Sequence, residues 1–270
     1  MILFFVKEER MDIKKSGKTK SDLEEPKFIR GYGWNLVKTN PTKIFIGISG
    51  IIGAGKTTFS DQLSQVIGVP MQKEQVETNP YLDKFYDDMK QYSFSMQVHL
   101  LNERFEQHQK IIWGSGGAIQ DRTIYEDPIF AKMLFKKELM SSLDYATYMA
   151  LFQNMLSFVR KPNLIVYLDV SVETAMERIR KRGRECELAI TEEYLTDLKR
   201  HYDEWCVEAS TNVPVIKICW NENIATEEAY IQAMGGVAKK IEEICEKYRY
   251  GLHPGILIQG RFDGQDLVIE

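Results

Sequence analysis

The residue types best suited to chemistry gather between Gly47 and Thr58, where the sequence reads GISGIIGAGKTT. Gly50 to Thr57 fit the pattern G-x-x-x-x-G-K-[ST], in which a glycine-rich turn directs backbone N–H groups toward a phosphate. In that pattern Lys56 reaches the β- and γ-phosphates of a nucleoside triphosphate, and the Thr57 hydroxyl binds Mg²⁺. The candidate triphosphate-binding residues are Gly50, Ile51, Ile52, Gly53, Ala54, Gly55, Lys56, Thr57 and Thr58.

The flanks of this motif are those that a phosphate-binding loop requires. An apolar, β-branched run at 44–48 predicts a buried parallel strand, and a helical pattern from Thr57 to Ile67 follows and ends at Gly68. The helix N-terminus adds positive potential where the phosphates bind. The alternative is a glycine turn that only joins strand to helix, and the Lys-Thr pair argues against it.

Acidic side chains and an arginine follow two further predicted strands. The run 68–76 predicts a short second strand that ends near Glu74, and 118–120 predicts a strand that leads into Asp121 and Arg122. Ligands of an open parallel sheet bind at the carboxyl ends of its strands, so we expect these side chains to face the phosphate loop across one crevice. For Glu74 the alternative is a solvated loop carboxylate.

A long amphipathic helix is predicted over 94–112. Gln97 and Arg104 are seven residues apart on it, and two helical turns place them on one face. Because two leucines lie between them, we expect this face to line a pocket. The alternative is that Arg104 lies on the solvated face beside Glu103.

Strand and helix patterns alternate along most of the chain, which predicts a parallel sheet covered by helices on both faces. The expected fold class is α/β, a three-layer sandwich of the P-loop NTPase type with five strands. The other predicted elements are helical segments up to about residue 158, strands at 164–170 and 213–219, and helices after Ser171, after Thr191 and over 224–248.

Composition limits the classes of function. A chain of 270 residues with 44% hydrophobic residues can form one large α/β core with tails. The net charge of −4 argues against binding to nucleic-acid polymers, and no apolar run approaches the ~18 residues of a membrane span. Four scattered cysteines favour reduced thiols and a cytoplasmic protein, although import into an organelle stays open.

Three regions are expected along the chain. Residues 1–40 have little periodicity and are predicted to form a disordered extension. Residues 41–250 carry the motifs and form the predicted α/β domain. Residues 251–270 contain Pro254, several glycines and two short apolar runs, and either add an edge strand or stay loose.

Several stretches, taken in order, make the chain resemble the deoxynucleoside kinase family, the group of deoxycytidine, deoxyguanosine and deoxyadenosine kinases. The likeness is greatest to bacterial-type deoxyadenosine/deoxyguanosine kinases. It runs from about Ile44 to Ile241, and such an ordered set is more specific than any one motif. The stretches are Glu74-Gln75-Val76, Asn79 to Leu82, Tyr86, Gln97 with Arg104, Gln120 to Asp127, Leu168 to Val170, and Arg178 to Glu187.

The resemblance implies ATP-dependent phosphorylation of a deoxynucleoside 5′-hydroxyl in nucleotide salvage, with Mg²⁺ and ATP. Glu74 would be the general base, and Arg122 would hold Glu74 and steady the transferring phosphoryl group. Asp121 would reach the Mg²⁺ shell together with Thr57. The remaining catalytic residues would be Lys56, Arg182 and Arg184.

The acceptor site is implied in the same way. Tyr86 and Glu187 would hydrogen-bond the sugar 3′-hydroxyl. Gln97, Arg104 and Asp127 would read the edge of the nucleobase, since Arg presents parallel N–H donors and an ionised Asp accepts from an exocyclic amine.

The basic cluster from Arg178 to Arg184 would include an arginine-rich lid that closes on the phosphates through Arg182 and Arg184. Five basic side chains so close together repel one another without anions, which favours the lid. The alternative is a solvated helix end. Further ATP contacts are implied for Arg178, Arg182, Asn221, Glu222 and Asn223.

A purine deoxynucleoside is the preferred acceptor, and deoxycytidine stays open because Arg104 and Asp127 also suit cytosine.

One alternative is a nucleoside monophosphate kinase, which would need more basic residues between Glu74 and Arg104. Another is a non-catalytic regulatory module, which predicts loss of Glu74, Arg122 or the lid arginines. The resemblance also implies a homodimer through the long helices, which apolar surface at 145–158 would fit. No membrane or nucleic-acid polymer is expected as a partner. The preferred base, phosphate donor and feedback inhibitor are not fixed by the sequence.

Overall fold

The computed structural model describes residues 44–74, 79–114, 117–222, 224, 226–247, 257–262 and 267–269. These residues all fall within one structural unit, Leu36–Glu270. The prediction of a disordered extension at 1–40 lies outside the described residues.

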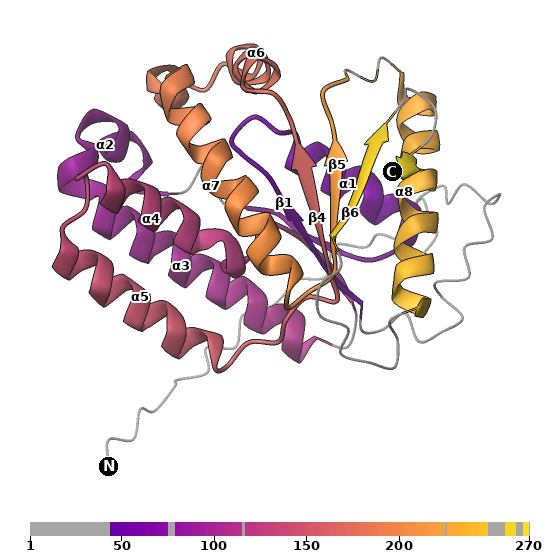
Figure 1. Cartoon of the computed structure of the whole chain (residues 1–270), viewed down its shortest axis with the longest axis horizontal. Helices are drawn as coiled ribbons and strands as arrows, with labels where there is room; N and C mark the ends of the chain where they lie inside the picture. Colours follow the sequence, from indigo (N-terminus) through magenta and orange to yellow (C-terminus); the bar gives the residue numbers. More distant parts are fainter. Residues whose placement is uncertain are drawn as a thin grey trace, which may run out of the picture. The chain divides into compact units, whose positions relative to one another are not determined.

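A seven-stranded sheet with the order β2-β3-β1-β4-β5-β6-β7 forms the centre of this unit (Figure 1). Every neighbouring pair from β2 to β6 is parallel, and β7 runs antiparallel to β6. The predicted α/β class with a parallel sheet is therefore confirmed. The strands are β1 (Phe45–Ser49), β2 (Met71–Gln72), β3 (Ala118–Asp121), β4 (Leu164–Asp169), β5 (Val215–Cys219), β6 (Leu257–Phe262) and β7 (Leu267–Ile269).

The prediction of five strands is wrong, because the tail at 251–270 adds two more. β6 pairs along the whole of β5, from Val215 opposite Leu257 to Cys219 opposite Arg261. Its sequence, LIQGRF, is a short apolar run interrupted by a glycine and an arginine, and such a run carries a weak strand signal. Pairing with β6 satisfies the backbone groups of β5 that would otherwise lie at an open edge.

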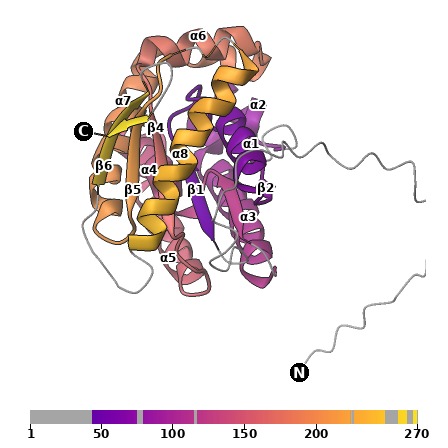
Figure 2. The ribbon, with the colours of Figure 1, turned by 90° about the vertical axis from the view of Figure 1, so that its right-hand side faces the viewer.

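Helices cover both faces of the sheet. In two perpendicular views α1 and α8 lie together on one face, and α3, α4, α5 and α7 lie on the other (Figures 1 and 2). No helix in the described part of the chain is both long and apolar enough to cross a membrane. The helices are α1 (Lys56–Ile67), α2 (Leu82–Asp87), α3 (Met89–Trp113), α4 (Asp127–Lys136), α5 (Ser142–Leu156), α6 (Val172–Arg182), α7 (Glu192–Ser210) and α8 (Glu227–Lys247), with short 3₁₀ turns η3 (Ile124–Glu126) and η4 (Glu185–Ala189).

Local sequence signals account for several helix ends. The Ser171 hydroxyl accepts a hydrogen bond from the Thr174 N–H at 3.1 Å, and the Thr191 hydroxyl accepts one from the Tyr194 N–H at 3.1 Å. Both residues are therefore the N-caps of the helices that the sequence predicts after them. Gly68 ends α1 in the left-handed conformation with φ 70°, which glycine adopts without a Cβ penalty.

The start of α2 is set by a turn that precedes it. The Asn79 side chain accepts a hydrogen bond from the Tyr81 N–H at 2.9 Å, which makes a turn, and the helix begins only at Leu82. α3 begins earlier than predicted, because the Asp88 carboxylate caps it by accepting from the Gln91 N–H at 3.0 Å.

Candidate active site

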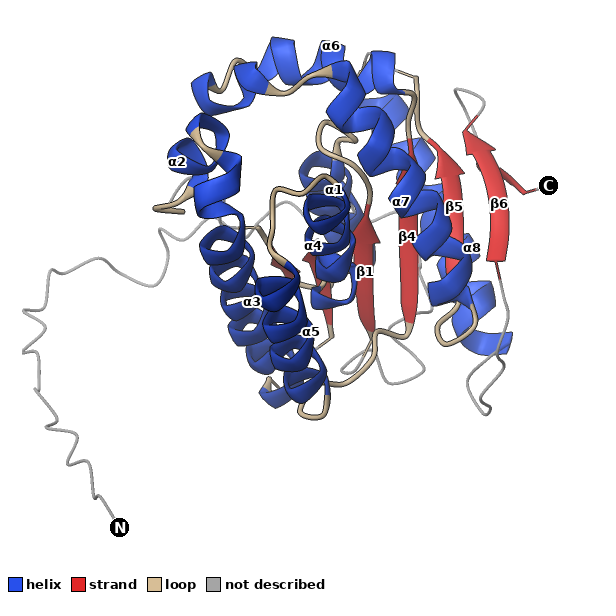
Figure 3. Ribbon diagram, turned by 60° about the vertical axis from the view of Figure 1, so that its left-hand side comes forward, coloured by secondary structure: helices blue, strands red, loops and turns tan. Residues whose placement is uncertain are grey.

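A cavity of about 290 Å³ lies at the carboxyl end of the parallel strands. The strand arrows of Figure 3 point toward this end, where α2 and α6 also lie. Most of the predicted catalytic and acceptor-site residues line the cavity. They are Lys56, Glu74, Tyr86, Gln97, Arg104, Arg122, Arg182, Arg184 and Glu187, and Thr57 and Thr58 of the phosphate loop line the cavity as well.

The phosphate loop connects β1 to α1 and packs tightly against α6. Gly53 has φ 82°, and a Cβ built on it would lie 2.5 Å from the Ala175 carbonyl oxygen, so only glycine fits. Buried Lys56 donates to the Ile51 carbonyl oxygen at 2.9 Å, which folds its side chain back over the loop. A loop of this form presents its backbone N–H groups to an anion.

The pKa of Lys56 is lower than that of an exposed lysine. Burial lowers the pKa of its ammonium group to about 8, and the nearby Arg122 guanidinium contributes to this lowering, while Asp121 and Glu74 oppose the shift. An anion in the loop would favour the charged form of Lys56.

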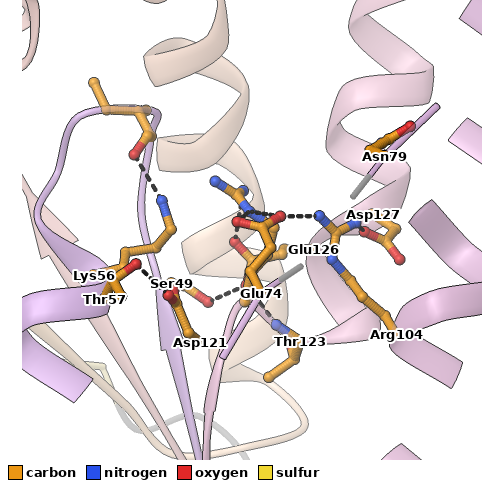
Figure 4. A network of polar contacts seen from close by, with 12 residues as sticks. Ser49, Lys56, Thr57, Glu74, Asn79, Arg104, Asp121, Thr123, Glu126 and Asp127 are labelled. Carbon is orange, nitrogen blue, oxygen red and sulfur yellow. Dashed lines mark hydrogen bonds and ion pairs between the residues drawn. The ribbon is translucent and has the colours of Figure 1, made fainter. Parts of the chain in front are cut away.

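Thr57 and Asp121 form a hydroxyl–carboxylate pair beside the loop. The Thr57 hydroxyl donates to Asp121 Oδ2 at 2.5 Å (Figure 4). Asp121 Oδ1 is buried and has no hydrogen-bond partner among the described residues. Burial raises the pKa of Asp121, although Lys56 opposes the rise. Two oxygen ligands side by side, one of them unsatisfied, suit a hard cation such as Mg²⁺.

Glu74 is held between two arginines across the cavity from Lys56. Its Oε1 lies 2.5 Å from Arg104 Nη2 (Figure 4). The same oxygen lies 3.2 Å from Arg122 Nε. Burial alone would raise the pKa of Glu74, but Arg122, Arg104 and Lys56 outweigh it and lower the pKa. The side chain keeps 18% exposure, so an ionised carboxylate can still meet a ligand in the cavity.

Arg104 also forms an ion pair with Asp127, which lies fully buried behind it. Burial raises the pKa of Asp127 to about 7, against the opposing charge of Arg104. Asp127 Oδ2 and Gln97 Oε1 are buried acceptors without a hydrogen-bond partner among the described residues. Unsatisfied acceptors beside an arginine match the donor-and-acceptor edge of a nucleobase.

The predicted lid arginines converge on Glu187 in η4. Arg182 Nε donates to Glu187 Oε2 at 3.0 Å, and Arg184 Nη1 donates to Oε1 at 3.2 Å. Tyr86 lies close enough to Glu187 that this carboxylate, after burial, helps to raise the pKa of the phenol. The lid and the predicted sugar-binding pair therefore share one carboxylate.

Arg178 of α6 and two predicted ATP-binding residues after β5, Asn221 and Glu222, lie beside the loop but do not line the cavity. Arg178 donates to the carbonyl oxygens of Ala54 at 3.2 Å, Trp220 at 3.0 Å and Glu222 at 3.2 Å. Asn221 Oδ1 accepts from the Ser171 N–H at 2.7 Å. Asn223 lies outside the described residues.

Two residues near the site were not predicted, Glu126 and Tyr202. Glu126 Oε2 accepts from Arg122 Nη1 at 3.2 Å and from the Tyr202 hydroxyl at 2.5 Å. The spacing of Thr123 and Glu126 fits a capping box, a signal that would have found Glu126, whereas nothing in the sequence marks Tyr202.

The fold and the cavity define the chain as a phosphotransferase of the P-loop class. It belongs to the deoxynucleoside kinase family, whose model, "Deoxynucleoside kinase", matches residues 46–246. The resemblance inferred from the motifs is therefore confirmed, and the chain is a kinase that uses a nucleoside triphosphate.

Named relatives agree with this assignment. The chain is 47% identical over 194 residues to a deoxyadenosine kinase of Dictyostelium discoideum, covering 72% of this chain and 79% of the relative. It is 38% identical over 181 residues to a deoxyadenosine/deoxycytidine kinase of Bacillus subtilis (strain 168), covering 66% and 83%. The solved deoxyadenosine kinase from M. mycoides with bound dCTP matches with a TM-score of 0.65 and 33% identity, covering 74% of this chain and 100% of that one.

Proposed function

We propose that this kinase transfers the γ-phosphoryl group of ATP to the 5′-hydroxyl of a purine deoxynucleoside, deoxyadenosine or deoxyguanosine, in nucleotide salvage. The observation that best supports this proposal is that Lys56 and Glu74 line the same cavity. A triphosphate bound to the loop and a sugar hydroxyl bound to Glu74 would therefore lie next to each other. Deoxycytidine is the second acceptor to test, since the B. subtilis relative carries it in its name.

In this reaction Glu74 takes the proton of the 5′-hydroxyl while the sugar oxygen bonds to the γ-phosphorus and the bond from that phosphorus to ADP breaks. The arginines keep Glu74 ionised by lowering its pKa, which makes it a ready but weak base. A weak base suits a loose transition state, in which the hydroxyl loses its proton late. Arg122 bridges Glu74 and the transferring group.

Thr57 and Asp121 are the residues that would hold Mg²⁺, and the unsatisfied Asp121 Oδ1 supports that assignment. The ion would neutralise charge on the β- and γ-phosphates. Lys56 binds the same phosphates, and Arg182 and Arg184 close over them from the lid. Arg178, with Asn221 and Glu222, borders the donor nucleoside.

Arg104, Asp127 and Gln97 select the acceptor base. Arg104 supports this assignment because it forms ion pairs with both the buried Asp127 and the proposed catalytic carboxylate of Glu74. Tyr86 and Glu187 bind the sugar 3′-hydroxyl. The preference for a purine rests on the deoxyadenosine kinase relatives, because Arg104 and Asp127 suit cytosine as well.

We also infer a cytoplasmic homodimer. Leu143 of α5 and Phe158 just beyond it each keep 75% exposure, and Phe135 of α4 stacks on Tyr145 at 4.6 Å between ring centroids. Apolar side chains this exposed are common in subunit interfaces. Sedimentation velocity should give twice the chain mass, and a monomer at micromolar concentration would contradict the dimer.

An ADP-release assay with deoxyadenosine, deoxyguanosine, deoxycytidine, thymidine and dAMP tests the proposed reaction. We expect turnover with deoxynucleosides and the highest kcat/KM with a purine. Tight ATP binding without turnover of any acceptor would indicate a regulatory module. Turnover of dAMP alone would indicate a nucleoside monophosphate kinase.

A further inference from the structure

Glu126 is a fully buried carboxylate that lies beside the cavity without lining it. Its Oε1 accepts from the Ser49 hydroxyl at 2.9 Å and from the Thr123 N–H at 2.9 Å (Figure 4). Its Oε2 accepts from Arg122 Nη1 and from the Tyr202 hydroxyl. Each oxygen thus has two donors, so Glu126 is satisfied within the protein and has no reason to contact substrate.

Contacts from other residues must hold Arg122 in place, because its backbone is strained. It has φ 67°, in the left-handed region that is unfavourable for a residue other than glycine. Its N–H donates to the Ile48 carbonyl oxygen at 3.0 Å, which ties the turn to β1. This backbone turn sends the side chain back into the cavity, where the guanidinium lies 4.9 Å from the Phe130 ring centroid.

The guanidinium of Arg122 divides its donors between two carboxylates. Nε faces Glu74, and Nη1 is bound by both Glu126 and the Tyr202 hydroxyl. No described residue accepts a hydrogen bond from Nη2. One edge of the planar group is therefore fixed from behind, while the other nitrogen is available to a phosphoryl oxygen.

Tyr202 is itself held in place by α7. Lys199 and Asp203 flank it on that helix, and they form ion pairs with Asp169 of β4 and Lys217 of β5. The Asp203–Lys217 contact is 2.7 Å. These contacts tie the helix to the sheet on either side of Tyr202 and so fix the position of its hydroxyl.

We infer that Glu126 is a positioning residue of phosphoryl transfer, and that it acts with Tyr202 by orienting Arg122 toward both Glu74 and the transferring group. The inference rests on the proposed function and deepens it. Glu126 contacts no reacting atom, so its whole effect on the rate passes through Arg122.

A double-mutant cycle of Glu126→Gln and Arg122→Ala tests this directly. The amide side chain introduced by Glu126→Gln keeps an acceptor for Ser49 and Thr123, but its NH₂ group would face Arg122 with a donor. We expect kcat to fall about 10²-fold, as misplacement of a catalytic group does, with the Kd of ATP unchanged. In the Arg122→Ala background the same change should alter kcat less than about twofold. An equal loss in both backgrounds would overturn the inference.

Trp205→Phe is the matched control for a purely structural effect. Trp205 Nε1 donates to the Tyr125 carbonyl oxygen at 3.0 Å, so it also ties α7 to the turn after β3. Its ring packs edge-on against Tyr202 with 6.0 Å between centroids, an aromatic contact that phenylalanine can keep, so the substitution removes the tie to the turn and leaves Tyr202 a ring to pack against. We expect this variant to lose stability while kcat stays within about twofold of wild type. A kcat loss as large as that of Glu126→Gln would show that loosening α7 is sufficient, against the inference.

Tyr202→Phe decides the question if Glu126→Gln does not fold. It removes one hydroxyl and leaves the Glu126–Arg122 ion pair, so kcat should fall about tenfold in the wild-type background. In the Arg122→Ala background, Tyr202→Phe should leave kcat unchanged. An undiminished kcat would contradict the inference. Wild-type protein that phosphorylates no deoxynucleoside would instead refute the proposed function, which separates the two failures.

Discussion

Single side chains in this cavity serve more than one site at once. Glu74 binds both Arg104, which is paired with Asp127 in the proposed base pocket, and Arg122, which faces the phosphate loop. Glu187 likewise binds both lid arginines. In the proposed reaction, recognition of the acceptor and transfer of the phosphoryl group would thus be linked through shared carboxylates.

The lowered pKa of Lys56 predicts that the affinity for ATP depends on pH. Since burial holds its pKa at about 8 in the free enzyme, the ammonium group loses its proton as pH rises through 8. The Kd of ATP should then increase by up to about tenfold per pH unit above that value. Titration calorimetry between about pH 6.5 and 9.5 measures this.

Lys56→Met is the control for that titration. It should bind ATP weakly, and its Kd should not vary over the same pH interval because the titrating group is gone. A wild-type Kd that stays constant over the whole interval would show that Lys56 does not titrate there.

Among the elements, α6 and η4 carry the arginines of the proposed lid, and Gly183 joins them. Gly183 has φ 69°, ends α6, and separates Arg182 from Arg184. A Cβ at this position would meet only the Arg180 carbonyl oxygen, at 4.0 Å. A substitution here would therefore strain the backbone dihedral without a clash.

Gly183→Ala and Gly68→Ala form a matched pair, because Gly68 ends α1 with φ 70° and open space around it. Both changes should lower the free energy of unfolding by about 1 kcal/mol. Only Gly183→Ala should lower kcat, by about fivefold or more, which corresponds to ~1 kcal/mol of barrier. Denaturant unfolding and steady-state kinetics of both variants check this, and equal kinetics would argue against a hinge.

Elements set by nearby residues were predictable, and those set by distant contacts were not. The caps at Ser171 and Thr191 follow from one hydroxyl each. The second strand was predicted at 68–76 but spans only Met71–Gln72. One reason is that the Lys73 carbonyl oxygen accepts from the Gln107 side chain of α3 at 3.2 Å instead of extending the strand ladder.

The same distinction applies to the site. The phosphate loop is contiguous, and the order of strands brings Glu74 and Arg122 to one end of the sheet, so sequence reasoning placed them together. Glu126 and Tyr202 are 76 residues apart and meet only because α7 packs over β4. No local pattern predicts that contact.

At the scale of the whole molecule, the sheet depends on strands beyond the matched family region, which ends at residue 246. β6 covers the edge of β5, while β7 pairs only with β6. Deletion of residues 251–270 should therefore expose β5 and lower Tm by about 5 °C or more, the shift that ~2 kcal/mol produces. Deletion of residues 267–270 alone should lower Tm much less. Scanning calorimetry distinguishes them, and equal Tm values for both deletions would contradict this.

Glu74 and the phosphate loop form one active site only if the carboxylate takes the proton of the same sugar hydroxyl that receives the phosphoryl group. The direct measurement is kcat of Glu74→Gln with deoxyadenosine and saturating ATP, beside the Kd of ATP for the same variant. We predict that kcat falls by about 10²- to 10⁴-fold, the usual contribution of a general base, while the Kd stays within a few-fold of wild type. A kcat close to that of wild type would show that Glu74 is not the base.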